Sequence, residues 1–413
     1  MTHALSLLRS ERLAAALLLI AAAAGLVVAN TAAGPGAMAL QDAHLGIPGT
    51  PLDLSVGHWI SDGLLAVFFF VVAVELKNEF AVGQLNSFGR AVRPAIAALG
   101  GVIVPALVYL AVTAGSGYEG GWPIPTATDI AFALGVLAVF GRGIPSRLRV
   151  FILALAILDD IVAILIIAVF FTEAPNLPLL LLAALGVAAF GLLSLLLGPG
   201  RPGRPARPRA LRMLAAVLMV AVALATWSLV LASGVHATIA GVALGLVMAR
   251  RPAMRLRHAL EPVTNGAILP LFAFSAALVA IPAVSLGELA PPFWAILIAL
   301  PVGKLVGIAL GGALANRVGR RETSGSAPAQ RPTLGAAELV TAGALGGVGF
   351  TVSLLMNELA FAGSPEVADE GTLAVLLGSA IAIVVSAVLV SRLAAAHRRS
   401  GAVSPPAASP TAG

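Results

Sequence analysis

Long apolar runs alternate with short polar or Pro/Gly-rich breaks along almost the whole chain. A helix needs about 20 mostly apolar residues to cross a hydrocarbon core, and the runs have roughly this length. The pattern therefore predicts an all-α polytopic membrane protein with about twelve transmembrane helices. The expected spans are 13–29, 59–76, 94–114, 122–140, 150–171, 178–198, 213–232, 235–249, 263–283, 292–313, 335–357 and 372–391.

Composition supports this class and excludes several others. The chain is 59% hydrophobic and 11% charged, whereas soluble domains carry about 25% charged residues. It contains no cysteine, so neither a disulfide framework nor a cysteine-based metal site is expected. We expect residues 1–399 to form a single transmembrane domain, and residues 400–413 to be a disordered cytoplasmic tail because of their composition.

The positive charges fall on one side of the predicted membrane. Of the 25 Lys and Arg residues, all but Lys304 precede the first span or follow an even-numbered span. Loops after odd-numbered spans carry acids instead. This positive-inside pattern predicts a multi-pass protein of the cell membrane (the inner membrane) with both termini cytoplasmic. It also accounts for the net charge of +6 without a nucleic-acid partner.

Three segments of the chain allow more than one interpretation. Residues 213–249 carry no Lys, Arg, Asp or Glu, so the charge rule requires two short crossings there, with a turn at Ser233 and Gly234. The first apolar run follows arginines as a signal peptide would, but an uncleaved span suits a polytopic protein better. The Pro/Arg-rich loop 198–209 fits either contact with anionic lipid or a simple orientation signal.

Four charged residues lie near the middle of predicted spans. Asp159 and Asp160 are adjacent in the otherwise apolar run 151–171, where each charge costs roughly 2.5–3.5 kcal/mol. Lys304 lies near mid-span in LPVGKLVGIAL, far from both interfaces, so we expect it to pair with one of these aspartates. Asp129 is the fourth. Charged residues at this depth typically mark ion or proton pathways.

Two spans carry helix-breaking residues at their centres. In 121–135, two prolines precede Thr126, Thr128 and Asp129, and in 341–355 four glycines crowd the middle. Interrupted spans in both halves of a chain are typical of transporters built from inverted repeats. Half-helix ends place partial charges at mid-membrane, which Asp129 and Lys304 would offset. Direct contact between Asp129 and an ion is the alternative.

Other titratable residues lie near span ends. His236 stands where a short span begins, and it is either a gate or pH-responsive group or a hydrogen-bonded cap. Glu75 and Glu79 close the second span on its cytoplasmic side, as the rim of a cation funnel or as a solvated helix end. Asp62 is expected to offset the N-terminal dipole of that span.

Seven motifs cover nearly the whole membrane portion of the chain. They are DGLLAVFFFVVAVELKNEF (62–80), PTATDIAFALGVLAVFG (125–141), FILALAILDDIVAILIIAVFFT (151–172), SGVHATIAGV (233–242), ILPLFAF (268–274), GKLVGI (303–308) and GGVGFTVSLL (346–355). Among them PTATD and LDD are highly specific strings. Together the motifs resemble the NhaA sodium/proton antiporters, and they occur in the family's order.

The resemblance implies inverted repeats and two discontinuous helices that cross near the ion site. It implies Asp160 as the principal ligand of the cation and the proton, with Asp159 beside it. It also implies Asp129 and Lys304 as compensators of helix dipoles, with Thr128 near the site. Lys304 would pair with Asp159 and exchange its proton during transport.

The activity implied is electrogenic export of Na⁺ or Li⁺ in exchange for protons, activated at alkaline pH and serving sodium and pH homeostasis. No cofactor and no enzymatic reaction are expected, and Na⁺ would be bound only as cargo. Homodimers are implied through an extracytoplasmic hairpin, here 43–58.

The chain departs from the family pattern at three places. The Ala-Asn-Ala-Gly usual after LPLFAF is Ser-Ala-Ala-Leu at 275–278, and the Asn usual before Asp62 is Ser61. In RLRHALEP (255–262), Arg257 stands where a member used to study the pH response has an acid, and a glutamate replaces a histidine. The pH set point is therefore left open. The candidates for a cytoplasmic funnel and pH response are Glu75, Glu79, His258 and Glu261.

Two other functions compete. A sodium-coupled symporter of related fold would need a pocket for an organic substrate, which the sequence does not indicate. An intramembrane aspartyl protease needs two aspartates that face each other from separate helices, whereas Asp159 and Asp160 are adjacent on one helix.

Overall fold

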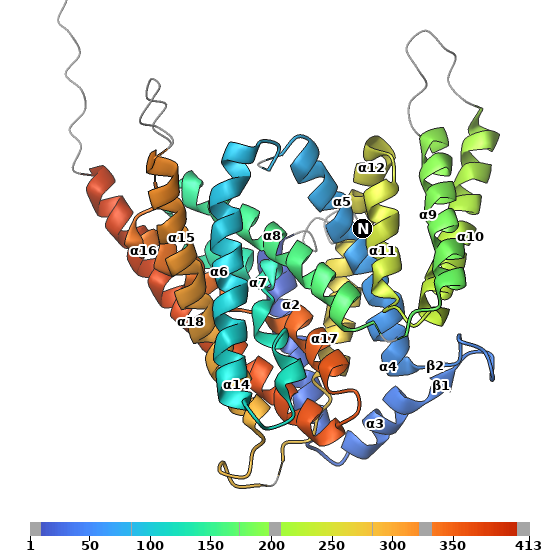
Figure 1. The fold of residues 1–413 in the computed structure, drawn as a ribbon, viewed down its shortest axis with the longest axis horizontal. Helices are drawn as coiled ribbons and strands as arrows, with labels where there is room; N and C mark the ends of the chain where they lie inside the picture. Colours follow the sequence, from blue (N-terminus) through green and yellow to red (C-terminus); the bar gives the residue numbers. More distant parts are fainter. Residues whose placement is uncertain are drawn as a thin grey trace, which may run out of the picture.

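The computed structural model describes residues 10–83, 85–172, 174–197, 208–282, 284–321 and 333–402. This part of the chain is overwhelmingly helical (Figure 1). Nine of its helices are long and apolar enough to cross a membrane, and one bent pair makes a tenth span. The two remaining expected spans correspond to the shorter α11 (Thr238–Val247) and to a composite helix over residues 250–276. The predicted all-α polytopic class is confirmed.

Six helices run without interruption. Their apolar sequences contain few residues that break a helix, although α6 carries two prolines. They are α2 (Glu11–Ala29), α6 (Phe88–Thr113), α8 (Ser146–Phe170), α9 (Leu177–Leu197), α10 (Arg209–Ala232) and α18 (Pro365–Ala402). The turn expected after α10 is present, with Gly234 at φ 81°. Only α11 is short, however, and α10 has 24 residues, so the expectation of two short crossings was wrong for the first of them.

Three further spans are continuous but contain a π-helical turn. Pro262 lies just before one of these turns and Pro301 lies within another. Proline has no backbone N–H and clashes with the carbonyl four residues earlier, so the helix rewinds locally. The spans are α4–η1–α5 (Val56–His58, Trp59–Leu64, Leu65–Ala81), α12–η4–α13 (Arg250–Val263, Thr264–Ile268, Leu269–Ala276) and α14–η5–α15 (Pro291–Ile298, Ala299–Gly303, Lys304–Arg321).

Two spans are broken, as their Pro and Gly residues predict. The first consists of the 3-10 turns η2 (Glu119–Gly121) and η3 (Ile124–Thr126), an extended link, and α7 (Ile130–Phe140). The second consists of α16 (Ala336–Gly346) and α17 (Phe350–Ala360), which are bent by 50° relative to each other.

The closest packing joins α6 to α15. Gly100 and Gly307 face each other, and a Cβ added at either would lie 2.3 or 2.2 Å from the carbonyl oxygen of the other. Small residues let membrane helices approach closely. In Figure 1, α6, α15, α16 and α18 lie toward one side of the molecule, and α9 and α10 pack against each other at the opposite edge. Gly307 is one turn beyond Lys304, so this contact fixes the position of the lysine.

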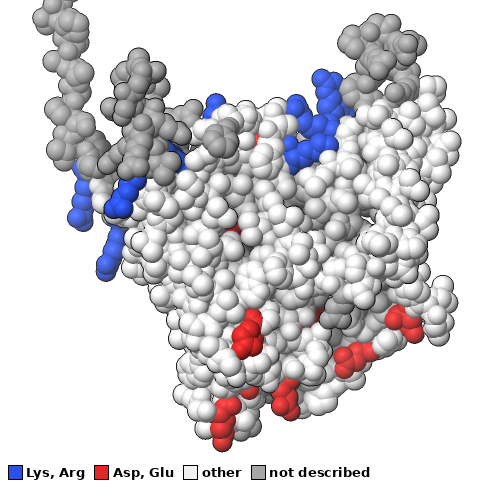
Figure 2. All heavy atoms as spheres, viewed as in Figure 1, with Lys and Arg blue, Asp and Glu red and all other residues white. Residues whose placement is uncertain are grey.

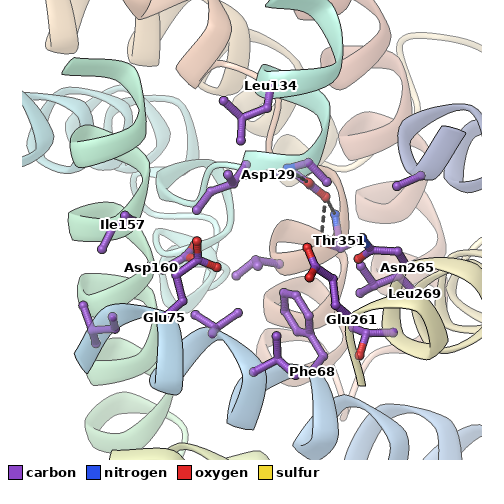
Figure 3. Close-up of a pocket in the computed structure, with 18 of the residues that line it drawn as sticks. Phe68, Glu75, Asp129, Leu134, Ile157, Asp160, Glu261, Asn265, Leu269 and Thr351 are labelled. Carbon is purple, nitrogen blue, oxygen red and sulfur yellow. Dashed lines mark hydrogen bonds between the residues drawn. The ribbon is translucent and has the colours of Figure 1, made fainter. Parts of the chain in front are cut away.

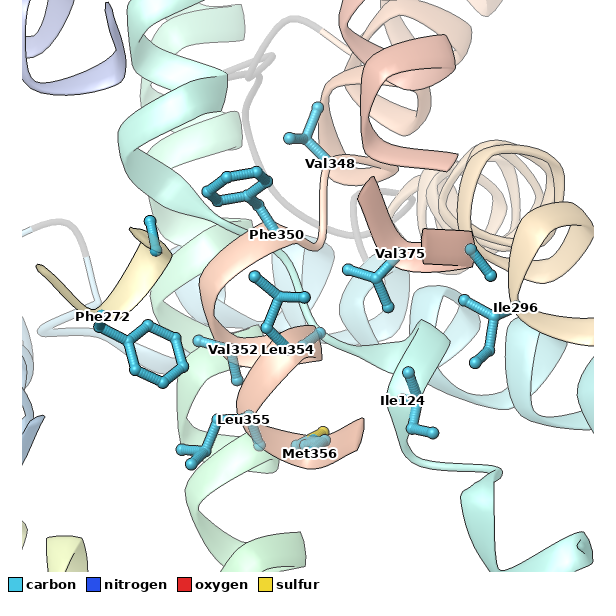
Figure 4. Packing of buried hydrophobic residues seen from close by; sticks show 14 of the residues in the cluster. Ile124, Phe272, Ile296, Val348, Phe350, Val352, Leu354, Leu355, Met356 and Val375 are labelled. Atoms are coloured by element: carbon cyan, nitrogen blue, oxygen red, sulfur yellow. The ribbon is translucent and has the colours of Figure 1, made fainter. Parts of the chain in front are cut away.

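The main apolar cluster surrounds α17. Figure 4 shows Phe350, Leu354 and Met356 of this helix among side chains from other elements, including Phe272 of α13 and Ile124 of η3. Phe350 also packs edge-on against Phe132 of α7, with ring centroids 4.7 Å apart. The cluster therefore holds the half-helices of both broken spans against each other.

The edge helices α9 and α10 show the opposite pattern. On α9, Leu181, Leu185 and Leu192 are each 67–68% exposed. Exposed leucines along a uniformly apolar helix are expected of a surface that faces lipid rather than water. These helices therefore contribute less than α17 to the packed centre.

Charged side chains separate toward the two ends of the molecule. In Figure 2, Lys and Arg gather at the upper end and most visible Asp and Glu at the lower end. The lower end also carries α3 (Gly34–Asp42) and an antiparallel hairpin of β1 (His44–Leu45) and β2 (Leu54–Ser55). The segment 43–58 thus contains the hairpin that was expected there.

Two expected features lie partly or wholly beyond the described residues. The Pro/Arg-rich loop is outside them from 198 to 207, and the tail is outside them from 403 onward. The last turn of α18 extends to Ala402.

Candidate functional site

The two broken spans cross at their interruptions and bond to each other there. The backbone N–H of Asp129 donates to the carbonyl of Val348 at 2.6 Å, and the hydroxyl of Thr128 donates to the carbonyl of Gly346 at 2.8 Å. The hydroxyl of Ser353 donates to the carbonyl of Ile124 at 2.8 Å. Each break thus satisfies backbone groups freed by the other, as irregular backbone inside a membrane protein requires.

Asp129 lies at the N-terminal ends of two half-helices. Its Oδ1 accepts hydrogen bonds from the backbone N–H of Ala131 and Phe132 in α7, at 3.0 and 3.4 Å. Its Oδ2 accepts bonds from the N–H and the hydroxyl of Thr351 in α17, at 3.2 and 2.7 Å. One carboxylate therefore caps the positive ends of both helices. Thr351 was not singled out from the sequence, although it follows the glycine break by two residues.

Lys304 is fully buried and pairs with Asp159. Its Nζ lies 2.5 Å from Asp159 Oδ2 and donates to the hydroxyl of Thr128 at 3.0 Å. Since that hydroxyl also donates to the carbonyl of Gly346, the lysine charge is linked to the C-terminal end of α16. Asp159 is 3% exposed and Thr128 is 4% exposed, so this group is closed to solvent.

Asp160 faces a different environment. Successive residues of an α-helix point about 100° apart, and Asp160 opens onto a cavity of about 170 Å³ (Figure 3). Oxygen-bearing residues line this cavity with it, and hard cations prefer oxygen ligands. They include Glu75, Glu261, Asn265, Thr264, Thr351 and Asp129. Thr264 and Asn265 were not predicted from their sequence context.

An ion pair lies among the residues that line this cavity. Arg257 Nη2 of α12 lies 3.0 Å from Glu75 Oε2 of α5, and both side chains border the cavity. Glu261 borders it as well, one turn further along α12. Glu79 and His258, the other two funnel candidates, are not among the lining residues, although His258 Nδ1 lies 3.6 Å from Glu261 Oε2.

His236 lies in a separate buried cluster near the end of α5 opposite Glu75. Its Nε2 is 3.0 Å from Asp62 Oδ1 and its Nδ1 is 2.7 Å from the hydroxyl of Thr238. Trp227 donates to the carbonyl of Asp62 at 3.0 Å. Asp62, which lies within the π turn η1, therefore pairs with His236 and does not act only on the helix dipole. Glu358, near Ser61 and Asp62, was also missed by the sequence reasoning.

A third cluster joins the ends of α8, α16 and α18. Arg147 donates through Nε and Nη2 to Glu338 Oε1 at 3.2 and 2.8 Å, and His397 Nε2 lies 3.7 Å from the same oxygen. The other oxygen of Glu338 accepts the N–H of Gly335 at 2.8 Å and caps α16. This cluster anchors one half of a broken span to the helix that carries Asp159 and Asp160.

No group of three or more His, Cys, Asp or Glu residues within the described ranges is arranged to hold a resident metal ion. The cavity offers carboxylate, amide and hydroxyl oxygens to a small cation instead. Beside it lies a carboxylate already neutralised by a lysine. Chemically, this arrangement can exchange protons and a hard monovalent cation at Asp160.

Known proteins resemble this chain over nearly its full length. The family model described as Na+/H+ antiporter 1 matches residues 5–390. The chain is 62% identical to the Na(+)/H(+) antiporter NhaA 2 of Clavibacter michiganensis, over 96% of this chain and 94% of that protein. It is 42% identical to the Na(+)/H(+) antiporter NhaA of Tropheryma whipplei, over 93% and 94% of the two chains, and to that of Mycolicibacterium smegmatis, over 95% and 88%. The chain therefore belongs to the Na+/H+ antiporter 1 family.

Proposed function

We propose that this protein exports Na⁺, and also Li⁺, across the cell membrane in exchange for protons, by secondary active and electrogenic antiport. The observation that carries the proposal is that the two adjacent aspartates of α8 have different surroundings. Asp160 opens to a cavity lined by oxygen atoms, whereas the adjacent Asp159 is neutralised by Lys304. The similar proteins named above are transporters rather than enzymes, in agreement with this proposal.

Proton and cation compete for the same carboxylates. Protonated Asp160 is neutral and has no need of Na⁺, whereas ionised Asp160 attracts Na⁺ into the cavity. When Na⁺ binds, Asp159 turns from Lys304 to the cation, and the lysine releases its proton. One proton leaves from Asp160 and one from Lys304 for each Na⁺ that binds, and this unequal charge makes the exchange electrogenic. The two aspartates and Lys304 titrate as one coupled unit.

The other predicted residues have supporting roles. Asp129 compensates the N-terminal ends of α7 and α17, and Thr128 connects Lys304 to the end of α16. Glu75 and Glu261 attract cations toward Asp160 from the cytoplasm, and Glu79 and His258 contribute to the pH response from outside the cavity. His236, paired with Asp62, serves as a gate on the extracytoplasmic side.

The orientation follows from the charges. We place both termini and the Arg-rich end in the cytoplasm, in line with the positive-inside rule and the charge separation in Figure 2. The cavity then opens on the cytoplasmic side. The hairpin of β1 and β2 lies outside, where it joins two copies into a homodimer, and anionic lipid contacts the basic end. No cofactor takes part.

Na⁺-driven proton movement in everted membrane vesicles tests the proposal. Vesicles from cells that produce the protein are acidified inside by respiration, and the lumenal pH is followed with a fluorescent dye. Na⁺ or Li⁺ added outside should discharge the pH gradient without any organic substrate, and K⁺ should not. A response that requires an organic substrate would favour a symporter, and no response at any pH from 6.5 to 9 would overturn the proposal.

Electrogenicity needs a separate measurement. In proteoliposomes with an imposed Na⁺ gradient and no respiratory chain, exchange of two protons for one Na⁺ should generate a membrane potential, reported by a potential-sensitive dye. A protonophore should accelerate the exchange by collapsing that potential. Exchange that proceeds without a potential would contradict the two-proton stoichiometry while leaving antiport intact.

A further inference from the structure

Arg257 is the one basic residue that lines the cavity within the part of the chain the structure describes. It belongs to α12, which carries four arginines, a histidine and a glutamate, and it reaches across to Glu75 of α5 at 3.0 Å. Its side chain is 17% exposed, whereas Arg255, two residues earlier on the same helix, is exposed. The pair therefore belongs to the cavity rather than to the outer surface of the helix.

The hydrogen bonding of Arg257 is incomplete. Its Nε is buried and has no partner among the described residues, so the contact with Glu75 is made at the end of the guanidinium and not through a bidentate fork. A guanidinium held by one carboxylate oxygen can move away when that carboxylate binds another cation. Because arginine stays protonated at any pH a cell reaches, its charge is permanent.

The charges around the pair determine what it does. Glu75 of α5 faces Arg257, and Glu261 follows Arg257 by one turn on α12. Both glutamates line the cavity, and Glu75 is close enough to Asp160 to act on it electrostatically. Glu79, Lys77 and His258 lie on the same two helices, outside the lining. With both glutamates ionised, Arg257 reduces the charge of this group from −2 to −1. In a cavity with low-dielectric walls, a difference of one unit charge strongly changes the electrostatic attraction of an incoming cation.

We propose that Arg257 is a tethered cation that occupies Glu75 and thereby sets the Na⁺ concentration at which Asp160 is loaded from the cytoplasm. Na⁺ reaching the cavity competes with the guanidinium for Glu75 and is repelled by it on the way to Asp160. Arg257 is thus an affinity-determining residue and touches neither the proton nor the cation at Asp160. The inference rests on the proposed antiport function.

Neutralising Arg257 should strengthen the attraction of the cavity for cations. We expect Arg257→Gln to lower the apparent KM for Na⁺ by about three- to tenfold at fixed pH, the effect of one unit charge at moderate range in a partly screened site. The maximal exchange rate should change by less than about twofold, because the groups that exchange ions are intact. The difference from wild type should shrink as choline chloride raises the ionic strength.

Matched variants separate this role from a general effect of charge. Arg255→Gln removes the same charge from the same helix at an exposed position and should leave the KM unchanged. Arg257→Lys keeps the charge and should stay within about twofold of wild type. Glu75→Gln frees the guanidinium, so it should raise the KM, and Glu75→Gln combined with Arg257→Gln should return it toward the wild-type value.

The measurement is Na⁺-dependent discharge of the pH gradient in everted vesicles, supported by calorimetric titration of purified protein with NaCl. An unchanged KM in Arg257→Gln, or an equal shift of the KM in Arg255→Gln, would overturn the inference about Arg257. The proposed function would still stand in either case if the wild-type protein exchanges Na⁺ for protons. If wild type does not exchange Na⁺ for protons, the proposed function itself fails. Should Arg257→Gln not fold, Glu75→Gln still decides, because a lowered KM there contradicts the tethered-cation role.

Discussion

The two sides of α8 differ more than their sequence suggests. On one side Asp159 is 3% exposed and bonded to a fully buried lysine. On the other side Asp160 borders a cavity that it shares with two glutamates and the ends of two half-helices. Identical side chains one residue apart thus have opposite surroundings, because the helix pitch turns them about 100° apart.

The difference indicates which side of α8 also stabilises the fold and which side is open to incoming ions. A buried ion pair is costly to break, since removing one partner leaves an uncompensated charge in a low dielectric. A carboxylate at a cavity can gain or lose a proton or cation without disturbing its neighbours' packing. Changes on the Lys304 side should therefore act on folding as well as on transport, and changes on the cavity side mainly on transport.

The largest effect is expected at Asp160. Asp160→Asn keeps the size of the side chain but removes the charge that attracts Na⁺ and the group that carries the proton. Exchange in everted vesicles should fall by at least about a hundredfold, a loss of more than about 2.7 kcal/mol at 1.36 kcal/mol per tenfold step.

The same substitution at exposed Asp42 is the matched control, and it should leave exchange unchanged. The thermal midpoint of Asp160→Asn in detergent should stay within a few degrees of wild type. Full exchange by Asp160→Asn would contradict the assignment of cation binding to the Asp160 side of α8. A large loss of stability in this variant would contradict the assignment of a mainly transport role to that side.

The next effect is expected on stability at Lys304. Lys304→Gln leaves the Asp159 carboxylate buried without its partner, which typically costs 3–5 kcal/mol. The double variant Lys304→Gln with Asp159→Asn removes both charges and should recover most of that loss. Denaturant unfolding of the purified single and double variants measures this coupling. Additive losses would mean that the two residues do not stabilise each other.

The comparison also shows what the sequence can and cannot predict. The helix breaks near Pro125 and Gly347 were predictable, because proline and glycine act through their own backbone within one turn. So was a carboxylate partner for Lys304, since an intramembrane charge requires one. The choice between Asp159 and Asp160 did not follow from the residues. It came from the family resemblance, and the structure pairs Lys304 with Asp159.

Contacts between distant segments were beyond the sequence pattern. Thr351 bonds to Asp129 across 222 residues, and Arg257 meets Glu75 across the cavity. Neither pairing can be recognised from the neighbouring residues in the sequence, because each depends on how separate helices cross.

The π turn before Lys304 was also missed, although Pro301 marks it, because a proline within an apolar run predicts a kink without specifying its geometry. Of the four funnel candidates, Glu75 and Glu261 line the cavity, whereas Glu79 and His258 do not.

A smaller effect is expected where the two broken spans meet. Thr351→Val keeps the side-chain shape but removes the hydroxyl that donates to Asp129 at 2.7 Å. The carboxylate retains its backbone donors, so the loss of stability should be about 1–3 kcal/mol. Thr50→Val, at an exposed hairpin position, is the matched control and should cost less than about 0.5 kcal/mol. Equal losses in the two variants would remove any special role for the Asp129 contact.

The smallest effect is expected for the stabilisation of the folded protein by bound Na⁺. Na⁺ that binds only the folded protein stabilises it by RT ln(1 + [Na⁺]/Kd), about 1.4 kcal/mol at ten times the Kd. Wild-type protein should therefore melt at a higher temperature in NaCl than in an equal concentration of choline chloride, and Asp160→Asn should show no such difference. The Thr351→Val variant should keep the Na⁺-dependent shift despite its lower starting stability, because its cavity still contains Asp160. A shift that survives in Asp160→Asn would place the cation elsewhere, and one that disappears in Thr351→Val would extend the binding site to the crossing of the broken spans.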